Sequence, residues 1–397
     1  MDSVLCVRHL RSTIVHADPT SEYERVVTES SAVWVLVPMM PSTDDHLQYY
    51  GDFEQGRDEF ARAFDALGIA WRWQPVSLDT VESTILEMQR SGVTCAINLC
   101  DGDELQGVPG LSVIDALERA EIPYTGSNRF FYDLTTSKID MKRAFEDAGV
   151  PTSRWSVVEP KQSDWQSPFQ RPGRPLIVKP AVSAGSLGIG VNNVVHTPDE
   201  LATRVQALAE GYRGWDLMSG GLIAEEFVVG REYTTFIVGD HHDLRNRRVY
   251  APVERVFNGA LPATQQFLSF DRLWEFHDQE SPLPEGENLW EYARVSGART
   301  AAIKAVSWDA YVAVGGVGYG RVDLREDAET GELFVLEVNA QCGLSEDENF
   351  TSIGAILRFA GVPYHALIEQ LMRHAERRHR RQQRARRVEL NVARRVA

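Results

Sequence analysis

FVLEVNAQCGL, residues 334–344, is an apolar run that carries two oxygen-bearing side chains, those of Glu337 and Asn339. Side chains two residues apart in a β-strand point to the same face of the sheet. A third oxygen-bearing side chain, that of Asp323, lies in GYGRVDLR (318–325), which we predict to be the partner strand. Mg²⁺ prefers oxygen ligands and usually shares them with nucleotide phosphates. The two segments therefore predict a triphosphate–magnesium site. The alternative is a buried strand whose Glu caps a turn and whose Asn opens one.

The chain is long enough for two or three domains, because 397 residues, 43% of them apolar, can bury a large core. No run of about 18 apolar residues occurs, so we expect no membrane span. The start, MDSVLCVRHLRST, lacks the apolar core of a secretory signal. The cysteines at positions 6, 95, 100 and 342 show no metal-binding spacing. These features favour a reduced, cytoplasmic protein.

Charge is distributed unevenly along the chain. The formal net charge is −16, but ten arginines stand against two glutamates from Arg373 onward, and the rest of the chain carries 31 basic and 55 acidic residues. So acidic a body argues against nucleic-acid binding. We expect the tail to be a solvated extension of the last helix, the alternative being contact with an acidic surface. Only five lysines occur against 36 arginines, so lysine is rare in this chain and Lys138 and Lys179 stand out.

Strands and helices alternate over residues 31–128. Apolar runs predict strands at 33–39, 69–76 and 94–100, with helices at 54–68, 81–92 and from 111 onward. This order implies an α/β domain with a parallel sheet. We predict two further α+β units over 129–221 and 222–374, with helices at 135–151 and 197–211 and a helix pair at 351–374. Residues 1–30 form an N-terminal extension and residues 375–397 an arginine-rich tail.

A loop of small residues, VSAGSLGIG (182–190), links the strand predicted at 175–181 to another at 191–195. Lys179 lies near the end of the first strand. Backbone amides freed by small residues can approach phosphate closely, while a lysine supplies a point charge. The lysine precedes the glycines, unlike a Walker loop, and the loop joins two strands, unlike a Rossmann fingerprint. The segment therefore predicts either a phosphate cover or a plain β-hairpin loop.

AEEFVVGRE (224–232) surrounds an apolar run with acids. We interpret it as an adenine-binding edge, at which main-chain groups meet the base. Glu225 would face the exocyclic amine and Glu232 the ribose hydroxyls. The alternative is that these acids form the solvent face of an exposed strand pair.

Taken in order, these segments resemble the ATP-grasp superfamily. Lys138 on a helix, Lys179 with its glycine loop, EEFVVGRE, GYGRVDLR and LEVNAQCGLS occur in that superfamily's order and spacing. Within the superfamily, the chain is most similar to the D-alanine–D-alanine ligase group, as YTGS (124–127), AGVP (148–151) and FAGVP (359–363) indicate. The resemblance covers about residues 31–372. Its ATP and metal motifs are specific, whereas its substrate motifs are not.

The resemblance implies a three-domain fold with ATP held between the second and third domains. It assigns phosphate contacts to Lys138, Lys179 and the loop around Ser186. It assigns adenosine contacts to Glu225, Glu226, Phe227, Val228 and Glu232, and two Mg²⁺ ions to Asp323, Glu337 and Asn339.

The reaction that the resemblance implies forms an amide or peptide bond in two steps. A carboxylate attacks the γ-phosphate of ATP to give an acyl-phosphate, and an amine then displaces phosphate. Positioned cations promote phosphoryl transfer, which suits Lys179 and the Ser186 loop. Arg321, two residues before Asp323, is placed to stabilise the oxyanion of the tetrahedral intermediate. The glycine loop and residues 257–270 would form a lid that excludes water.

Three positions depart from the ligase pattern at the first substrate and the lid. Glu54 aligns with the ligase glutamate that meets the first amino group, but the glycine-rich turn around it is absent. Gly185 stands where the ligase carries its substrate-linked serine. Gln266 and Phe267 replace the Lys-Tyr pair of the ligase lid, so a tyrosine hydroxyl is missing.

A further departure concerns the second substrate. After Gly343, the ligase run that receives the second carboxylate is replaced by Ser-Glu-Asp-Glu, ending at Glu348. Three adjacent acids repel a carboxylate and attract a cationic or carboxylate-free amine. We therefore expect an amino-acid-like carboxylate to be joined to an amine other than D-alanine. The alternative is that these acids face solvent.

Other functions stay open at this point. The chain could be a true D-alanine–D-alanine ligase, an L-amino-acid or natural-product amide ligase, or a non-catalytic ATP-binding regulatory module. Contact of the arginine-rich tail with nucleic acid is a weaker alternative. We expect small-molecule amino acid and amine substrates, no nucleic-acid partner and no membrane contact. Ligases of this shape are often homodimers.

Overall fold

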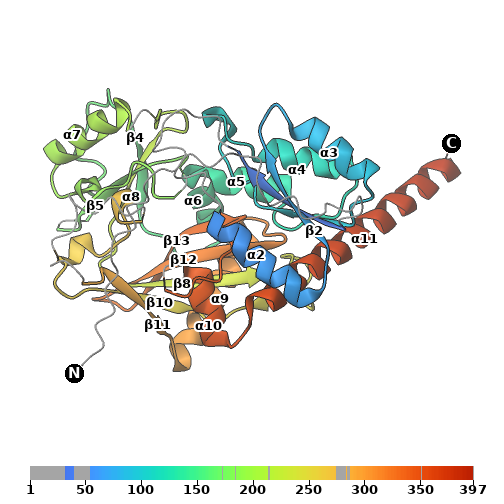
Figure 1. The fold of residues 1–397 in the computed structure, drawn as a ribbon. Helices are drawn as coiled ribbons and strands as arrows, with labels where there is room; N and C mark the ends of the chain where they lie inside the picture. Colours follow the sequence, from blue (N-terminus) through green and yellow to red (C-terminus); the bar gives the residue numbers. More distant parts are fainter. Residues whose placement is uncertain are drawn as a thin grey trace, which may run out of the picture.

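The computed structural model describes residues 32–39, 54–171, 173–183, 185–212, 215–273, 283, 287–349 and 351–396. The predicted N-terminal extension, residues 1–30, lies outside the described residues. The described chain forms a parallel sheet at its N-terminal end and two antiparallel sheets after it (Figure 1). This arrangement confirms the predicted α/β fold class.

The N-terminal sheet contains β1 (Val33–Pro38), β2 (Trp71–Val76) and β3 (Cys95–Asn98) in the order β2-β1-β3, all parallel. Every residue of β1 is buried, and alternate side chains enter two separate apolar clusters on opposite faces. Helices α3 (Val81–Arg90) and α4 (Leu111–Arg119) supply one cluster, and α2 (Glu54–Leu67) supplies the other. A central strand buried on both faces needs a continuous apolar run, as VWVLV provides.

The second sheet is antiparallel, in the order β4-β7-β5-β6. Its strands are β4 (Trp155–Val158), β5 (Leu176–Pro180), β6 (Val194–Val195) and β7 (Leu222–Glu226), with α7 (Pro198–Ala209) packed against β5 and β6. The strand predicted at 191–195 is shorter than expected, because residues 191–193 form a 3₁₀ turn, η2 (Val191–Asn193). The Asn193 amide donates to the carbonyls of Val178 (2.6 Å) and Gly188 (2.8 Å), which ties down the end of the glycine loop.

The helix predicted at 135–151 is the second of two helices. Helix α5 (Arg129–Thr136) ends at Ser137, whose hydroxyl caps α6 (Lys138–Asp147) by accepting a hydrogen bond from the Asp140 amide at 3.3 Å. Such a serine at the N-cap replaces a missing intrahelical partner. Lys138 is therefore the first residue of its helix.

The third sheet is antiparallel and joins β11 (Trp290–Arg294), β10 (Val253–Phe257), β8 (Gly230–Val238), β12 (Tyr319–Asp327) and β13 (Leu333–Ala340) in that order, with β9 (Arg248–Val249) paired to β8. Helix α9 (Gly297–Ala313) packs on one face. Helices α10 (Ser352–Ala360) and α11 (Tyr364–Val396) pack on the other face, together with α2 (Figure 1). The remaining short helices are η1 (Glu104–Gln106), η3 (Ala263–Gln265) and α8 (Phe270–Leu273).

The arginine-rich tail is the continuation of α11, which runs unbroken to residue 396 and extends past the rest of the ribbon (Figure 1). One face of its first part is buried. Arg378 is only 4% exposed, and it donates to the carbonyls of Gly126 and Tyr124, each at 2.7 Å. Asp240, which precedes β9, accepts from Arg381 and lies 3.3 Å from His374. The helix thus joins the third sheet to the N-terminal domain.

Replacing Arg378 by methionine should loosen this junction. The carbonyls of Tyr124 and Gly126 lose a buried charged donor, and an unsatisfied buried group costs roughly 1–3 kcal/mol. We expect a loss of about 2–4 kcal/mol of stability, seen as a lower midpoint in thermal or urea unfolding. Arg380→Met is the matched control, because Arg380 is exposed on the helix surface and pairs with Glu376 of the same helix at 3.2 Å. It should cost less than about 0.5 kcal/mol, and equal losses in the two variants would contradict the proposed role.

Candidate active site

Asp323 on β12 lies directly opposite Glu337 on β13, and Arg321 lies opposite Asn339. The pairing shifts between Asp323 and Leu324, so that Leu336 is an extra residue in β13. The Asn339 amide donates to both carboxylates at 3.1 Å. The Arg321 guanidinium donates to Asp323 at 3.0 and 3.2 Å. The structure therefore brings the three predicted metal ligands and the predicted catalytic arginine into one cluster.

The two carboxyl groups differ in their electrostatic surroundings. Burial and the charge of Arg321 act in opposite directions on Asp323, and the nearby charge of Glu337 helps to keep its pKa raised. Burial also disfavours ionisation of Glu337, but Lys138 and Arg321 outweigh it and lower its pKa. Among the described residues, no group of three His, Cys, Asp or Glu side chains is arranged to hold a metal ion. The oxygen set here consists of two acids and one amide.

Lys138 and Lys179 approach this cluster from the second sheet and its preceding helix. The Lys138 ammonium donates to the carbonyl (3.2 Å) and hydroxyl (3.3 Å) of Ser183, at the start of the glycine loop. Burial lowers its pKa. Lys179 on β5 pairs with Glu225 on β7. The charges of both lysines act on Glu337, so the cluster holds cations suited to phosphate.

Glu225 is clamped between two lysines. It is 2% exposed and pairs with Lys179 and also with Lys142, at 2.5 Å. Burial alone would raise its pKa, but the two ammonium groups lower it well below its usual range. Lys142 was not among the predicted residues. Its signal was available in the sequence, since it is another of the five lysines and lies one helical turn after Lys138.

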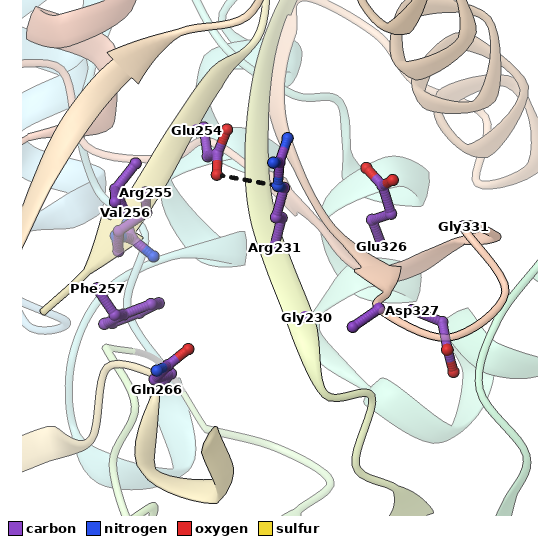
Figure 2. A pocket seen from close by; sticks show the side chains of 11 residues that line it. Gly230, Arg231, Glu254, Arg255, Val256, Phe257, Gln266, Glu326, Asp327 and Gly331 are labelled. Atoms are coloured by element: carbon purple, nitrogen blue, oxygen red, sulfur yellow. Dashed lines mark ion pairs between the residues drawn. The ribbon is translucent and has the colours of Figure 1, made fainter. Parts of the chain in front are cut away.

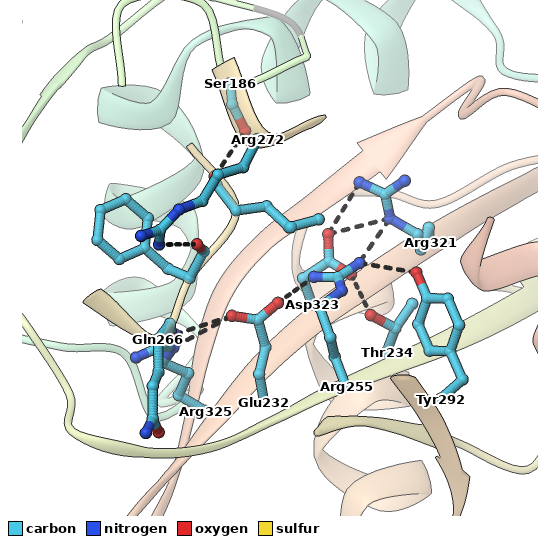
Figure 3. Close-up of polar contacts among 12 residues, drawn as sticks. Ser186, Glu232, Thr234, Arg255, Gln266, Arg272, Tyr292, Arg321, Asp323 and Arg325 are labelled. Atoms are coloured by element: carbon cyan, nitrogen blue, oxygen red, sulfur yellow. Dashed lines mark hydrogen bonds and ion pairs between the residues drawn. The ribbon is translucent and has the colours of Figure 1, made fainter. Parts of the chain in front are cut away.

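The remaining acids of AEEFVVGRE are also buried and paired. Glu226, 3% exposed, pairs with Arg171, and Glu232, 6% exposed, pairs with Arg255 and Arg325 (Figure 3). The alternative of a solvent-facing acidic strand pair is therefore wrong. The side chains of Phe227 and Val228 are buried in the turn between β7 and β8.

Residues 257–270 lie against the glycine loop. The Ser186 hydroxyl donates to the Leu268 carbonyl at 3.2 Å, and the Phe270 amide donates to the Ile189 carbonyl at 2.7 Å. The ring of Phe267 packs edge-on against Phe227, with ring centres 5.7 Å apart. Figure 3 shows the polar contacts of this region. The segment that we predict to be a lid is therefore in contact with the glycine loop and with Phe227.

An open cavity of about 490 Å³ lies at the end of the third sheet beside this network (Figure 2). Arg255 and Gln266 line it, and Arg231 and Glu254 form an ion pair across it at 3.7 Å. The other lining residues are Gly230, Val256, Phe257, Glu326, Asp327, Ala328 and Gly331. Phe257 and Gln266 belong to the predicted lid segment, but none of the residues predicted to bind ATP, metal or substrate lines this cavity.

The predicted substrate residues come from the start of α2 and from the loop after β13. Glu54 is the first residue of α2, and its side chain lies outside the described part of the chain. Gly343 follows β13 and leads into the acidic run. Within that run, Glu348 lies 3.7 Å from Arg358, and Glu346 pairs with Arg62 at 2.5 Å.

A buried carboxylate missed at the sequence level, that of Glu59, anchors the acidic run to α2. It is 1% exposed and accepts from the Ser345 hydroxyl (2.9 Å) and the Glu346 amide (3.0 Å). Sequence offered no direct signal for this contact, because its partners are more than 280 positions away.

Comparison with known proteins identifies the family. The family model described as "D-ala D-ala ligase C-terminus" matches residues 144–373. The chain belongs to the D-alanine–D-alanine ligase family. It is 31% identical to a D-alanine–D-alanine ligase of Chromohalobacter salexigens, over 66% of this chain and 72% of that one. It is 27% identical to the enzyme of that name from Stutzerimonas stutzeri, over 79% of this chain and 94% of the relative.

The fold of this ATP-grasp ligase also matches solved structures. The D-alanine–D-alanine ligase of Bacillus anthracis complexed with ATP superposes with a TM-score of 0.60 and 18% identity, covering 88% of this chain and 99% of that one. The enzyme of Coxiella burnetii gives 0.61 at 18% identity, covering 90% and 98%. In the described part of the ligase, no helix is both long and apolar enough to cross a membrane.

The ligase should depend on the Glu225 carboxylate for stability. Glu225→Gln leaves two buried ammonium groups without their shared counter-ion, and breaking a buried pair typically costs about 3–5 kcal/mol. Because the pKa of Glu225 is lowered in the folded state, its contribution is present above the unfolded pKa of about 4.3 and is lost as pH falls further. Urea unfolding at pH 7 should therefore show the full difference between the two proteins, and unfolding below about pH 4 a smaller one.

Glu226→Gln is the control for this comparison. Its partner Arg171 is 37% exposed, so hydration can replace much of the lost interaction and the loss should be smaller. Equal stability of wild-type and Glu225→Gln proteins at pH 7 would contradict the stabilising role of the ion pairs between Glu225 and the two lysines.

Proposed function

We propose that this ligase joins a carboxylate to an amine through an acyl-phosphate, with ATP and Mg²⁺. A carboxylate oxygen of the first substrate attacks the γ-phosphorus, and ADP leaves. The amine nitrogen of the second substrate then attacks the acyl carbon, inorganic phosphate leaves with the former carboxylate oxygen, and the nitrogen loses a proton. The observation that carries this proposal is the placement of Arg321 beside Asp323, opposite Asn339 and next to Glu337.

Arg321 is suited to oxyanion stabilisation. Its side chain is 29% exposed, so it is anchored and yet open to a ligand, and Asp323 orients it through Nε. A pre-oriented cation stabilises charge that develops in the transition state without reorganisation. A module that only binds nucleotide has little need for such a group, which disfavours a purely regulatory role.

The residues around Asp323 fit a divalent cation. Two carboxylates face each other, and the Asn339 amide lies 3.1 Å from both. A half-turn of an amide exchanges its nitrogen and oxygen, so the same position can present a third oxygen. Asp323, Glu337 and Asn339 would hold the ion, which when bound would neutralise and orient phosphate oxygens.

The lysines and the lid complete the proposed roles. Lys138 and Lys179 bind phosphate oxygens from the side of the second sheet, and Glu225 orients Lys179. The lid and the glycine loop, joined through Ser186 and Leu268, exclude water from the acyl-phosphate.

We propose further that the amine substrate lacks a free carboxylate. Two donors of the acidic run, the Ser345 hydroxyl and the Glu346 amide, are already held by the Glu59 carboxylate. Arg62 is paired with Glu346. An incoming carboxylate would thus meet occupied donors and negative charge. The second candidate is D-alanine–D-alanine ligation, favoured by the activity that names the relatives.

A substrate panel tests the choice between these functions. ATP-dependent phosphate release and amide product are measured with Mg²⁺ against single and paired amino acids and amines, with D-alanine as one member and Glu337→Gln protein as the blank. We expect turnover only when an amine without a carboxylate accompanies an amino acid. Fast turnover with D-alanine alone would instead establish the second candidate. ATP binding without turnover on any pair would contradict both.

Arg321→Met should lower kcat by about 10²–10³ while ATP affinity changes little, as expected for a donor used in the transition state. Steady-state kinetics measure the loss in kcat, and calorimetry measures the ATP affinity. Arg373→Met removes an arginine that is 65% exposed on α11, and it should leave both quantities unchanged. A rise in the ATP Kd that accounts for the whole loss in Arg321→Met would refute the oxyanion role.

A further inference from the structure

Arg325, two residues after Asp323 on β12, bonds to three separate parts of the chain. It is 2% exposed. Its guanidinium donates to the Val228 carbonyl at 2.9 Å and to the Glu232 carboxylate at 3.0 and 3.3 Å. It also donates to the Gln266 carbonyl (Figure 3). One side chain therefore joins the turn after β7, strand β8 and the lid.

The guanidinium also stacks on an aromatic ring. Its carbon lies 4.8 Å from the centre of the Phe227 ring, within the range of a cation–π interaction. The same ring also packs against the ring of Phe267, which belongs to the lid. Phe227, Val228 and Glu232 belong to the segment that we assign to adenosine, so the lid is fastened at the adenosine edge of the site.

The lid has its own internal support besides this contact. Arg272, 1% exposed, donates to the carbonyls of Gln265 and Phe267. These bonds shape the lid but do not join it to the adenosine edge. Arg325 makes that connection, because its guanidinium contacts Gln266 and Val228 at once.

We propose that Arg325 is a positioning residue that couples nucleotide binding to closure of the lid, an inference that rests on the proposed function. When adenosine occupies the edge formed by Phe227, Val228 and Glu232, Arg325 is held in place and seats the lid through Gln266. The seated lid keeps water from the acyl-phosphate, so that phosphate release and amide formation stay matched.

Arg255 offers a matched comparison. It pairs with the other oxygen of Glu232 and donates to the Tyr292 hydroxyl at 3.0 Å. Both arginines thus neutralise Glu232, but the hydrogen bonds of Arg255 among the described residues go to Glu232 and Tyr292 rather than to the lid. Comparing substitutions at the two positions separates loss of charge beside Glu232 from loss of the lid contact.

The first measurement is trypsin cleavage of the Arg272–Leu273 bond, followed by mass spectrometry. Arg272 is buried while the lid is docked, so cleavage reports lid opening. With saturating adenylyl imidodiphosphate and Mg²⁺, we expect wild-type and Arg255→Met proteins to be protected. Arg325→Met should be cut about 10- to 100-fold faster, the range expected for losing hydrogen bonds to a charged group. Arg325→Lys keeps the charge but not the fork of donors and should fall between.

The second measurement is the ratio of phosphate released to amide formed. We expect a ratio of one for wild-type and Arg255→Met, with a higher KM for ATP in the latter, and a ratio above one for Arg325→Met. If Arg325→Met only lowers the unfolding midpoint while protection and ratio match wild type, the proposal is overturned. If wild type forms no amide with any substrate pair, the proposed function fails, while trypsin protection still decides the role of Arg325.

Discussion

The like-charge pair formed by Asp323 and Glu337 across the β12–β13 ladder is the constraint on which the rest of the site depends. Like charges directly opposite each other destabilise a sheet. Burial disfavours ionisation of both carboxyl groups, but Lys138 and Arg321 outweigh it at Glu337 and lower its pKa, whereas the pKa of Asp323 stays raised. Arg321, Lys138 and the Asn339 amide each supply positive charge or a donor to this pair. Positively charged side chains therefore gather around this pair, as expected if it binds a cation in the proposed reaction.

Sequence predicted the members of this cluster because their signals are local. The spacing of Glu337 and Asn339 fixes their shared face, and the apolar run around them fixes the strand. Sequence did not show the extra residue Leu336, which brings Glu337 rather than its neighbour opposite Asp323. A bulge of this kind is set by pairing across strands and is common beside active sites, but it leaves no mark in the periodicity of either strand alone.

Ion pairs between residues that are distant in the chain also could not be predicted from local sequence patterns. AEEFVVGRE ends β7 and begins β8, and the partners of its acids include residues from elsewhere in the chain: Lys142, Arg171, Arg255 and Arg325. In an acidic protein, a run of acids suggests a solvated face. Here burial and pairing reverse that expectation, because an ionised buried carboxylate persists only with a counter-charge.

The arginine-rich helix shows how a segment outside the recognised motifs can support the site. Gly318 begins the approach to β12 with φ of +81°, and a Cβ there would lie 2.0 Å from the Gly126 carbonyl oxygen. Arg378 donates to that same oxygen, and Asp240, held by Arg381, accepts from the Gly318 amide at 3.3 Å. Only glycine permits this close approach. Arg321 follows three residues later, on β12, so its position is tied to the N-terminal part of the chain through α11. The arginines that were expected to form a solvated tail thus help to hold β12 against the N-terminal part of the chain.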